Sequence, residues 1–235
     1  FEEANSGGPD PGAPTISTSG GFQQFSTFAG TASTSQSLAV TGSNLTDAIS
    51  VIAPTGIEVS LDDLSFGPSV SLPAVGGTFY ARIAASAAEG QTQSSITLSS
   101  TGATDVAVPV TASVRPTSIA LPYGPDTFES TAFPWYTYTA TGSRSWLRSS
   151  AGGNSFMEIN GFDNAAGAVP ANAWLILGPF DVPAGVSNIV ATFNLQRAFN
   201  DLGDDSEFTF KYSADYAGEG DPASATWSDI AFTKP

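Results

Sequence analysis

The sequence predicts an all-β protein. Short runs in which apolar and polar residues alternate recur along the chain, and Gly, Pro, Asn and Asp separate them. Charged residues make up only 12% of the 235 residues, and Gly, Ser, Thr, Ala and Pro fill their place, as is typical of proteins with many short strands and tight turns. No stretch keeps the period of an amphipathic helix. Hydrophobic residues make up 41% of the chain, enough for a packed core.

Composition also excludes several classes of function. The chain has 7 basic and 22 acidic residues and a net charge of −15, which repels nucleic acid and anionic membrane surfaces. It contains no Cys and no His, so disulfides, thiol chemistry, His-based catalytic triads and zinc held by His or Cys are excluded. Any bound metal must therefore be a hard cation with oxygen ligands. No apolar run is long enough for a membrane helix.

Residues 15–114 are expected to form the first domain, after a linker or tail at residues 1–14 that is rich in Gly, Pro, Asn and Asp. Each alternating run is about five residues long and ends at a turn signal such as Pro54-Thr55-Gly56. Because a period of two places every second side chain on the same face, these runs predict a β-sandwich. The expected strands cover residues 37–41, 48–52, 57–61, 78–83, 95–99 and 106–114.

Three segments of this domain carry a resemblance. They are VTGSNLT at residues 40–46, PTGIEVS at residues 54–60 and ARIAASAAEG at residues 81–90. Residues 15–114 resemble a bacterial Ig-like repeat, a unit strung along large secreted proteins that include extracellular nucleases and surface hydrolases. The resemblance implies an Ig-like β-sandwich that acts as a spacer.

Residues 115–125, with the sequence RPTSIALPYGP, are expected to form a Pro-rich hinge, and residues 126–235 the second domain. Two stretches organise that domain. WLILGPFDV at residues 174–182 is an apolar run that ends in a Gly-Pro turn, and KYSADYAGEGDPASATW at residues 211–227 is a strand followed by an acidic, Gly-rich loop. Alternation predicts further strands at residues 190–195 and 207–213.

Together with Phe128-Glu129 and the Pro134-Trp135 pair, these stretches resemble the choice-of-anchor J and cleaved-adhesin group of secreted bacterial modules. The resemblance implies a jelly-roll β-sandwich. In that group further strands follow the Trp that matches Trp227, whereas this chain stops at Pro235. We therefore expect an open sheet edge that a strand from a partner could pair with.

Acidic residues cluster in two loops of the second domain. Carboxylates on Gly-rich loops can bind Ca²⁺, which takes about six to eight oxygen ligands, although the spacing is not that of an EF-hand loop. Two solvated acidic loops are the alternative interpretation. The resemblance favours calcium, because cleaved-adhesin modules are calcium-stabilised, and it implies Glu129 as a ligand. The candidate metal ligands are Glu129, Asp201, Asp204, Asp205, Glu207 and Asp221.

Aromatic residues form a second group of candidates. Exposed aromatic rings can stack on sugar rings, and polar groups beside them fix the orientation of the ligand. The alternative is that these side chains fill the core, as the apolar run around Trp174 indicates for that residue. The candidate ligand-binding residues are Trp135, Tyr136, Tyr138, Trp146 and Arg148.

These observations predict a non-catalytic extracellular protein of bacterial type, secreted or held at the cell surface. Its function would be a spacer joined to an adhesion or glycan-binding module, with an extracellular glycan or a surface protein as partner. A structural subunit of an extracellular fibre or surface layer, built from copies of itself by strand pairing, is a second hypothesis. An accessory fragment of a larger secreted hydrolase or nuclease is a third. Paired carboxylates could serve a glycosidase, but no catalytic motif accompanies them.

Overall fold

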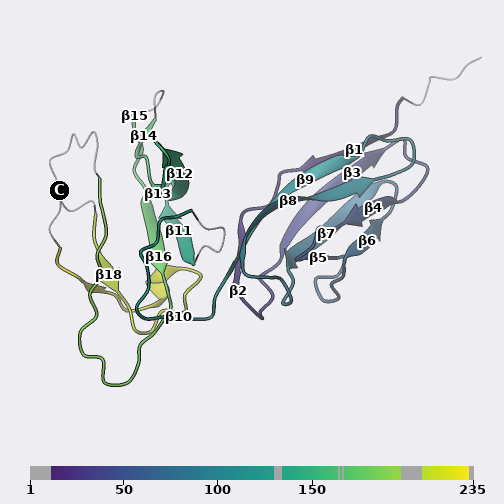
Figure 1. Ribbon diagram of the computed structural model, residues 1–235. Coiled ribbons are helices and arrows are strands. Elements are labelled where there is room, and N and C mark those ends of the chain that lie inside the picture. The colour runs from purple at the N-terminus through teal and green to yellow at the C-terminus, as the bar shows by residue number, and fades with distance from the viewer. Residues whose placement is uncertain (1–11, 130–133, 164, 166, 197–207, 233–235) are drawn as a thin grey trace, which may run out of the picture. The chain divides into compact units, whose positions relative to one another are not determined.

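The computed structural model describes residues 12–129, 134–163, 165, 167–196 and 208–232 (Figure 1). It confirms the all-β class. The strands pair mainly in antiparallel fashion, and the described ranges contain no α-helix; Pro222–Ser224 form a turn of 3₁₀ helix. The chain divides into two compact units, with the boundary between Thr117 and Ser118.

The first unit consists of two sheets. One has the order β1-β3-β7-β5, formed by Thr15–Ser19, Gln36–Ser43, Gly76–Ile83 and Ile57–Ser60. The other has the order β2-β9-β8-β4-β6, formed by Phe25–Phe28, Val106–Arg115, Gly90–Ser99, Ile49–Ile52 and Ser69–Leu72. Neighbouring strands are antiparallel except β2 and β9, which run parallel with Phe25 opposite Ala112. All six strands predicted for this domain are present.

Both sheets of the first unit contribute to one hydrophobic core. In β4, Ile49 and Val51 are fully buried while Ser50 and Ile52 are not, as the alternating sequence predicts. Phe79, in the other sheet, is also fully buried and belongs to the same cluster. Burying a side chain of this size stabilises the fold by roughly 1.5–3 kcal/mol. The unit is therefore a sandwich-like structure with its apolar faces packed together.

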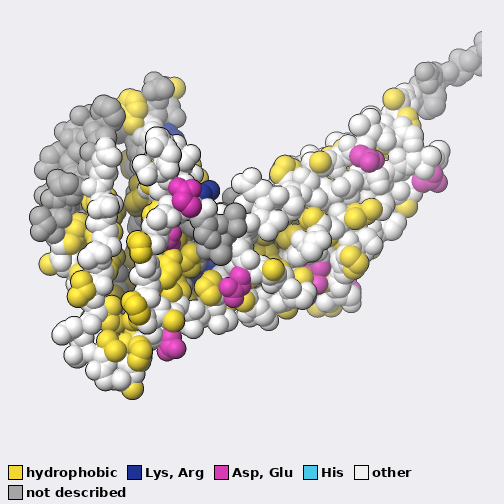
Figure 2. Space-filling model, in the orientation of Figure 1, with side chains coloured by type: hydrophobic (Ala, Val, Ile, Leu, Met, Phe, Trp, Pro, Cys, Tyr) yellow, Lys and Arg dark blue, Asp and Glu magenta, His cyan; other side chains and the backbone are white. Residues whose placement is uncertain are grey.

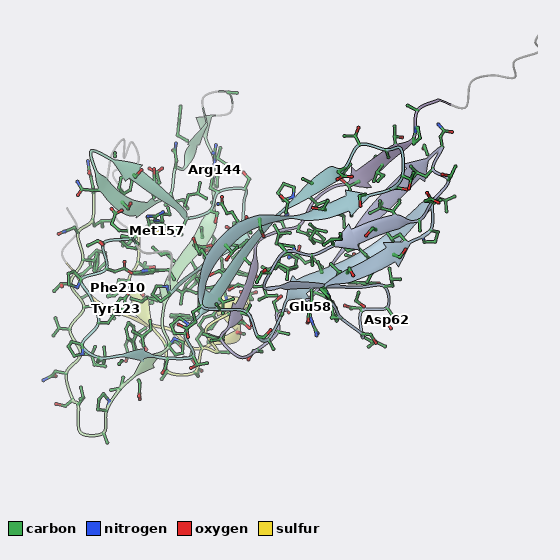
Figure 3. The ribbon with its side chains drawn as sticks, turned by 45° about the vertical axis from the view of Figure 1, so that its right-hand side comes forward. Glu58, Asp62, Tyr123, Arg144, Met157 and Phe210 are labelled. Atoms are coloured by element: carbon green, nitrogen blue, oxygen red, sulfur yellow. The ribbon has the colours of Figure 1, made fainter. Side chains whose placement is uncertain are left out.

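A loop organised by Asp62 covers the outer edge of β5 (Figure 3). Asp62 Oδ1 accepts hydrogen bonds from the backbone nitrogens of Ser65 at 2.8 Å and Leu64 at 3.0 Å, and from Ser60 Oγ at 2.8 Å. These hydrogen bonds lower the pKa of Asp62 to about 2; the bond from Ser65 has the largest effect, followed by those from Leu64 and Ser60. The loop ends where Val59 and Gly67 exchange two backbone hydrogen bonds of 2.8 and 2.9 Å. An unpaired edge strand invites pairing with other chains, so the loop protects this edge.

The second unit begins within the predicted hinge. β9 ends at Arg115, and β10 begins at Ile119. The described residues of this unit pair in two-stranded ladders. One ladder is parallel, between β10 (Ile119–Ala120) and β17 (Phe180–Asp181). The antiparallel ladders are β11 (Trp135–Thr141) with β16 (Asn172–Leu177), β12 (Leu147–Ala151) with β13 (Asn154–Glu158), β14 (Phe162–Asp163) with β15 (Gly167–Ala168), and β18 (Lys211–Tyr212) with β19 (Ser228–Asp229).

These ladders do not confirm the jelly-roll arrangement. The strand predicted at residues 190–195 is wrong, because that segment forms no ladder. Of residues 208–213, only Lys211 and Tyr212 form a strand. The core is also smaller: apart from prolines, all the buried hydrophobic side chains of the described residues except Ile119 and Ile176 lie in the first unit. No helix within the described ranges has the length and apolar character needed to cross a bilayer.

The loop at Asp62 generates a prediction about pH. Because its folded pKa is lowered, its carboxylate stabilises the first unit at pH values above the unfolded pKa of 3.8, and this contribution is lost as the pH falls through about 2. We expect Asp62→Ala to reduce the thermal stability of the first unit at neutral pH and to flatten its dependence on pH in the acidic range. Thermal unfolding followed at a series of pH values measures both effects.

Asp105→Ala removes an exposed acid of the same unit and serves as the control. If the melting temperature of Asp62→Ala changed with pH as steeply as that of the unmodified protein, the proposed role of this carboxylate would be contradicted.

Candidate functional site

The carboxylate of Asp126 fixes the start of the second unit. Its Oδ2 accepts hydrogen bonds from the Tyr123 hydroxyl at 2.6 Å and from Trp135 Nε1 at 2.7 Å, and its Oδ1 accepts from the backbone nitrogen of Phe128 at 2.8 Å. Burial, followed by the hydrogen bond to Asp126 and its negative charge, raises the pKa of Tyr123. The hydroxyl therefore remains protonated, and available as the donor, at neutral pH.

Phe128 adopts an uncommon backbone conformation next to this carboxylate. Its φ of 59° lies in the left-handed region, which bulky residues rarely occupy. The hydrogen bond from its backbone nitrogen to Asp126 supports the conformation, and its ring packs against Trp135 at a centroid distance of 5.5 Å. Asp126 thus holds both members of the aromatic pair, and it sets the direction in which the chain leaves Phe128.

The bend at Phe128 brings Glu129 and Arg148 together. Arg148, on β12, donates from Nε to the backbone oxygen of Phe128 and from Nη2 to Ser155 Oγ at 3.4 Å. Glu129 Oε1 accepts from the backbone nitrogen of Ser155 at 2.9 Å. Both charged side chains therefore contact the same serine of β13, although they are remote from each other in the sequence.

The hairpin of β12 and β13 forms the floor of this site. Ala151 lies opposite Asn154, so the connecting loop is Gly152-Gly153. The two glycines have φ values of 60° and 82°. A type I′ turn, one of the tight two-residue turns that connect hairpin strands, requires positive φ at both of its central residues, and glycine adopts such values without strain. The hairpin and Glu129 enclose an open depression of about 410 Å³, lined by Glu129, Arg148, Ser149, Ser150, Gly153 and Ser155.

The lining of the depression is polar and carries both signs of charge. A guanidinium group has five N–H donors, and Arg148 uses donors of only two nitrogens for Phe128 and Ser155. Within the described residues, Glu129 Oε2 has no hydrogen-bond partner, so it can accept from a ligand. The serine hydroxyls can both donate and accept. The arrangement can therefore hold a ligand that has donors and acceptors side by side.

Two of the predicted ligand-binding aromatics, Trp135 and Trp146, have packing contacts within the protein. Trp135 is held by Asp126 and Phe128, as described above. The indole Nε1 of Trp146 donates to the backbone oxygen of Ala173 at 3.3 Å, and its ring packs against Phe208 at 6.3 Å. Both side chains are half-buried, and neither lines the depression.

Tyr136 and Tyr138 also lie outside the depression, on one face of β11. Their ring centroids are 6.4 Å apart, and both side chains are half-buried. The Tyr136 hydroxyl accepts a hydrogen bond of 3.0 Å from the backbone nitrogen of Gly220, which ties the acidic loop to this strand. A role for the four aromatics in stacking on a ligand stays a prediction.

The acidic, Gly-rich motif at residues 211–227 folds into a packed loop. The ring of Trp227 packs against Trp174 and Tyr216, at centroid distances of 5.0 and 5.3 Å, and its Nε1 donates to the backbone oxygen of Pro222 at 2.8 Å. Asp215 Oδ1 accepts from Ser213 Oγ at 2.7 Å and from the backbone nitrogen of Thr226 at 2.9 Å, and these bonds lower its pKa. This carboxylate therefore closes the loop.

The described residues bring no three acidic side chains together in a group that could hold a metal ion. Glu129 lines the same depression as the cationic Arg148, which opposes a calcium ion there. Asp221 caps the 3₁₀ turn, where Oδ1 accepts from the backbone nitrogen of Ala223 at 2.9 Å. The other predicted ligands, Asp201, Asp204, Asp205 and Glu207, lie outside the described residues, so the calcium prediction depends on that loop.

The sequence analysis named the two charged residues that line the depression, Glu129 as a metal ligand and Arg148 as a ligand-binding residue, and it did not name the rest of the lining. Ser149, Ser150, Gly153 and Ser155 belong to the segment SSAGGNS, in which Gly-Gly between two short alternating runs is a hairpin signal. That signal would have identified the hairpin. It could not have shown that Glu129 lies against it, since this contact depends on the bend at Phe128.

Comparisons with known proteins add nothing to this description: no protein-family model matches the chain, and no curated protein matches it either.

The role of Asp126 can be tested by substitution. Asp126→Ala removes the acceptor for three donors, and we expect it to destabilise the second unit by roughly 2–3 kcal/mol, because hydrogen bonds to a charged group are among the stronger ones. Asp126→Asn keeps an acceptor and loses the charge, so the pKa of Tyr123 should fall. Thermal unfolding and an ultraviolet titration of the tyrosines measure the two effects.

Asp229→Ala is the matched control, since it removes an exposed acid that pairs with Lys211 at 2.5 Å on the surface of the same unit. Equal losses of stability in the two alanine variants would argue against a special role for Asp126.

Proposed function

We propose that the protein is a non-catalytic extracellular module of a secreted or surface-displayed bacterial protein, in which the first unit is an Ig-like spacer and the second a jelly-roll domain that binds a neutral glycan. The observation that carries the proposal is the depression in which Glu129 and Arg148 meet beside the β12–β13 hairpin.

The chemistry of the lining favours a polyhydroxyl ligand. Each hydroxyl of a sugar both donates and accepts, so neighbouring hydroxyls can donate to Glu129 and accept from Arg148. Hydrogen bonds to ionised groups are stronger than those between neutral groups. They can therefore fix the orientation of the ligand in a depression that lacks an apolar wall. An anionic ligand would meet Glu129 as well as a chain of net charge −15, whereas a neutral sugar meets no such repulsion.

Binding without catalysis is favoured by the same residues. The chain has no His or Cys, and the serine in contact with Arg148 receives a hydrogen bond from a cation, which is not a base that could take its proton. The first unit supports the spacer role through its single packed core and its protected β5 edge. An adhesion role for the second unit follows the resemblance noted in the sequence.

Binding of neutral oligosaccharides, first by array and then by calorimetry, tests the proposal. We expect Arg148→Ala and Glu129→Gln each to weaken binding at least about tenfold, because each removes a hydrogen bond to a charged group, worth roughly 1.5–3 kcal/mol. Glu158→Gln is the matched control, since Glu158 is an exposed acid on β13 that does not line the depression.

Affinity that survives both substitutions would place the ligand elsewhere, with the aromatic residues of β11 as the next candidates. Failure to bind any neutral oligosaccharide, in a protein whose unfolding is cooperative, would overturn the glycan proposal.

A further inference from the structure

We propose that the Asn160-Gly161 pair of the second unit is a site of spontaneous covalent modification, at which the side-chain amide of Asn160 is converted into a carboxyl group through a cyclic imide. The proposal does not depend on the glycan-binding function. Asn160 is the only asparagine of the sequence that is followed by glycine, and it lies between β13 and β14.

The reaction needs only groups of the chain itself and water. The backbone nitrogen of Gly161 attacks Cγ of Asn160, and the new N–C bond closes a five-membered ring, while Nδ2 leaves as ammonia with the proton that the Gly161 nitrogen gives up. Water then opens the ring at either of its carbonyl groups. Cleavage of the new bond to Cγ yields aspartate, and cleavage of the original peptide bond yields isoaspartate, in which the main chain runs through Cγ.

The attacking nitrogen is accessible. Asn160 and Gly161 are both exposed, and glycine has no Cβ that would shield its nitrogen. A Cβ at position 161 would lie 3.9 Å from the backbone oxygen of Val169, the nearest atom beyond the adjacent residues, so the surroundings are open as well. The Gly161 oxygen accepts a hydrogen bond of 2.7 Å from the Val169 nitrogen, whereas the Gly161 nitrogen donates to no group within the described residues. This nitrogen can therefore lose its proton to solvent base and react.

A local turn positions and polarises the amide that is attacked. Asn160 Oδ1 accepts a hydrogen bond of 2.9 Å from the backbone nitrogen of Phe162. The ring that this bond closes includes the Gly161 nitrogen, so the turn holds the side chain folded back along the main chain, near that nitrogen. Negative charge develops on Oδ1 during the attack, and the N–H of Phe162 is already directed at this atom, in the manner of an oxyanion-hole donor. The turn thus favours both the approach and the intermediate.

The products differ from the starting chain in charge and in the length of the main chain. Both add a carboxylate to a chain of net charge −15, and Figure 2 shows few charged side chains on the described surface, so the change is large enough to be resolved by ion exchange. Isoaspartate also adds a carbon to the main chain directly before β14, where Phe162 is opposite Ala168 and its oxygen accepts from Arg144 Nη2 at 3.2 Å. We expect this carbon to weaken the β14–β15 ladder.

Peptide mapping by mass spectrometry, during incubation of the full chain at a series of pH values, measures the reaction. We expect a carboxyl group to replace the amide of Asn160, with isoaspartate as well as aspartate among the products. The rate should rise with pH, because the attacking nitrogen must lose its proton. Asn154 and Asn172 are internal controls, since they are also exposed but precede Ser155 and Ala173, and they should keep their amides over the same period.

Gly161→Ala separates the chemistry from a structural effect. The open space around position 161 accommodates a methyl group, so thermal unfolding should show that the variant is as stable as the unmodified chain. The added Cβ hinders the nitrogen and should slow the loss of the amide at least about tenfold. Gly21→Ala makes the same change at an exposed glycine of the first unit with open surroundings, and it should leave the rate unchanged.

The contribution of the turn is measured by comparing the folded chain with the chain unfolded in urea, where the turn is lost. We expect the folded chain to react at least as fast. The proposal would be overturned if Asn160 kept its amide, if Asn154 or Asn172 reacted as fast as Asn160, if Gly161→Ala left the rate unchanged, or if the unfolded chain reacted much faster than the folded one.

Discussion

The hydrogen bonds accepted by Asp126 are the interaction on which the candidate site depends. A carboxylate with three donors fixes the backbone at Phe128 in a conformation that it would otherwise rarely adopt. That conformation aims the carbonyl of Phe128 at Arg148 and places Glu129 beside Ser155. The depression therefore owes its geometry to a side chain that does not line it. Such indirect support is common where charged groups must be held without deep burial.

The two units obtain their stability in different ways. The first closes its apolar faces on each other and leaves few large hydrophobic side chains in solvent. The described residues of the second bury little and depend on aromatic contacts, such as those of Trp227 with Trp174 and Tyr216, and on carboxylates that accept from backbone nitrogens. The second unit therefore depends on specific contacts of individual side chains, whereas the first depends on one shared core.

Sequence patterns predicted the first unit well because alternation has a direct physical cause there. Ile49 and Val51 lie in a core that both sheets share, and the alternation of apolar and polar residues predicts which side chains are buried there. The same alternation at residues 190–195 was misleading, because a strand also needs a neighbour to pair with, and no sequence pattern names that neighbour. The contact of Glu129 with the β12–β13 hairpin could not be predicted from the sequence either. It depends on the backbone conformation of Phe128 and on the hydrogen bond that Phe128 donates to Asp126.

The parallel pairing of β2 with β9 has a mechanical consequence. These strands lie near opposite ends of the first unit in sequence but run side by side in the same direction, with Phe25 opposite Ala112 and Phe28 opposite Arg115. A force that pulls apart the chain segments before β2 and after β9 acts backwards along β2 and forwards along β9. Their hydrogen bonds are then loaded in shear and share the force, whereas in a hairpin pulled open from one end they would break one at a time. The geometry therefore resists tension applied along the chain across these two strands.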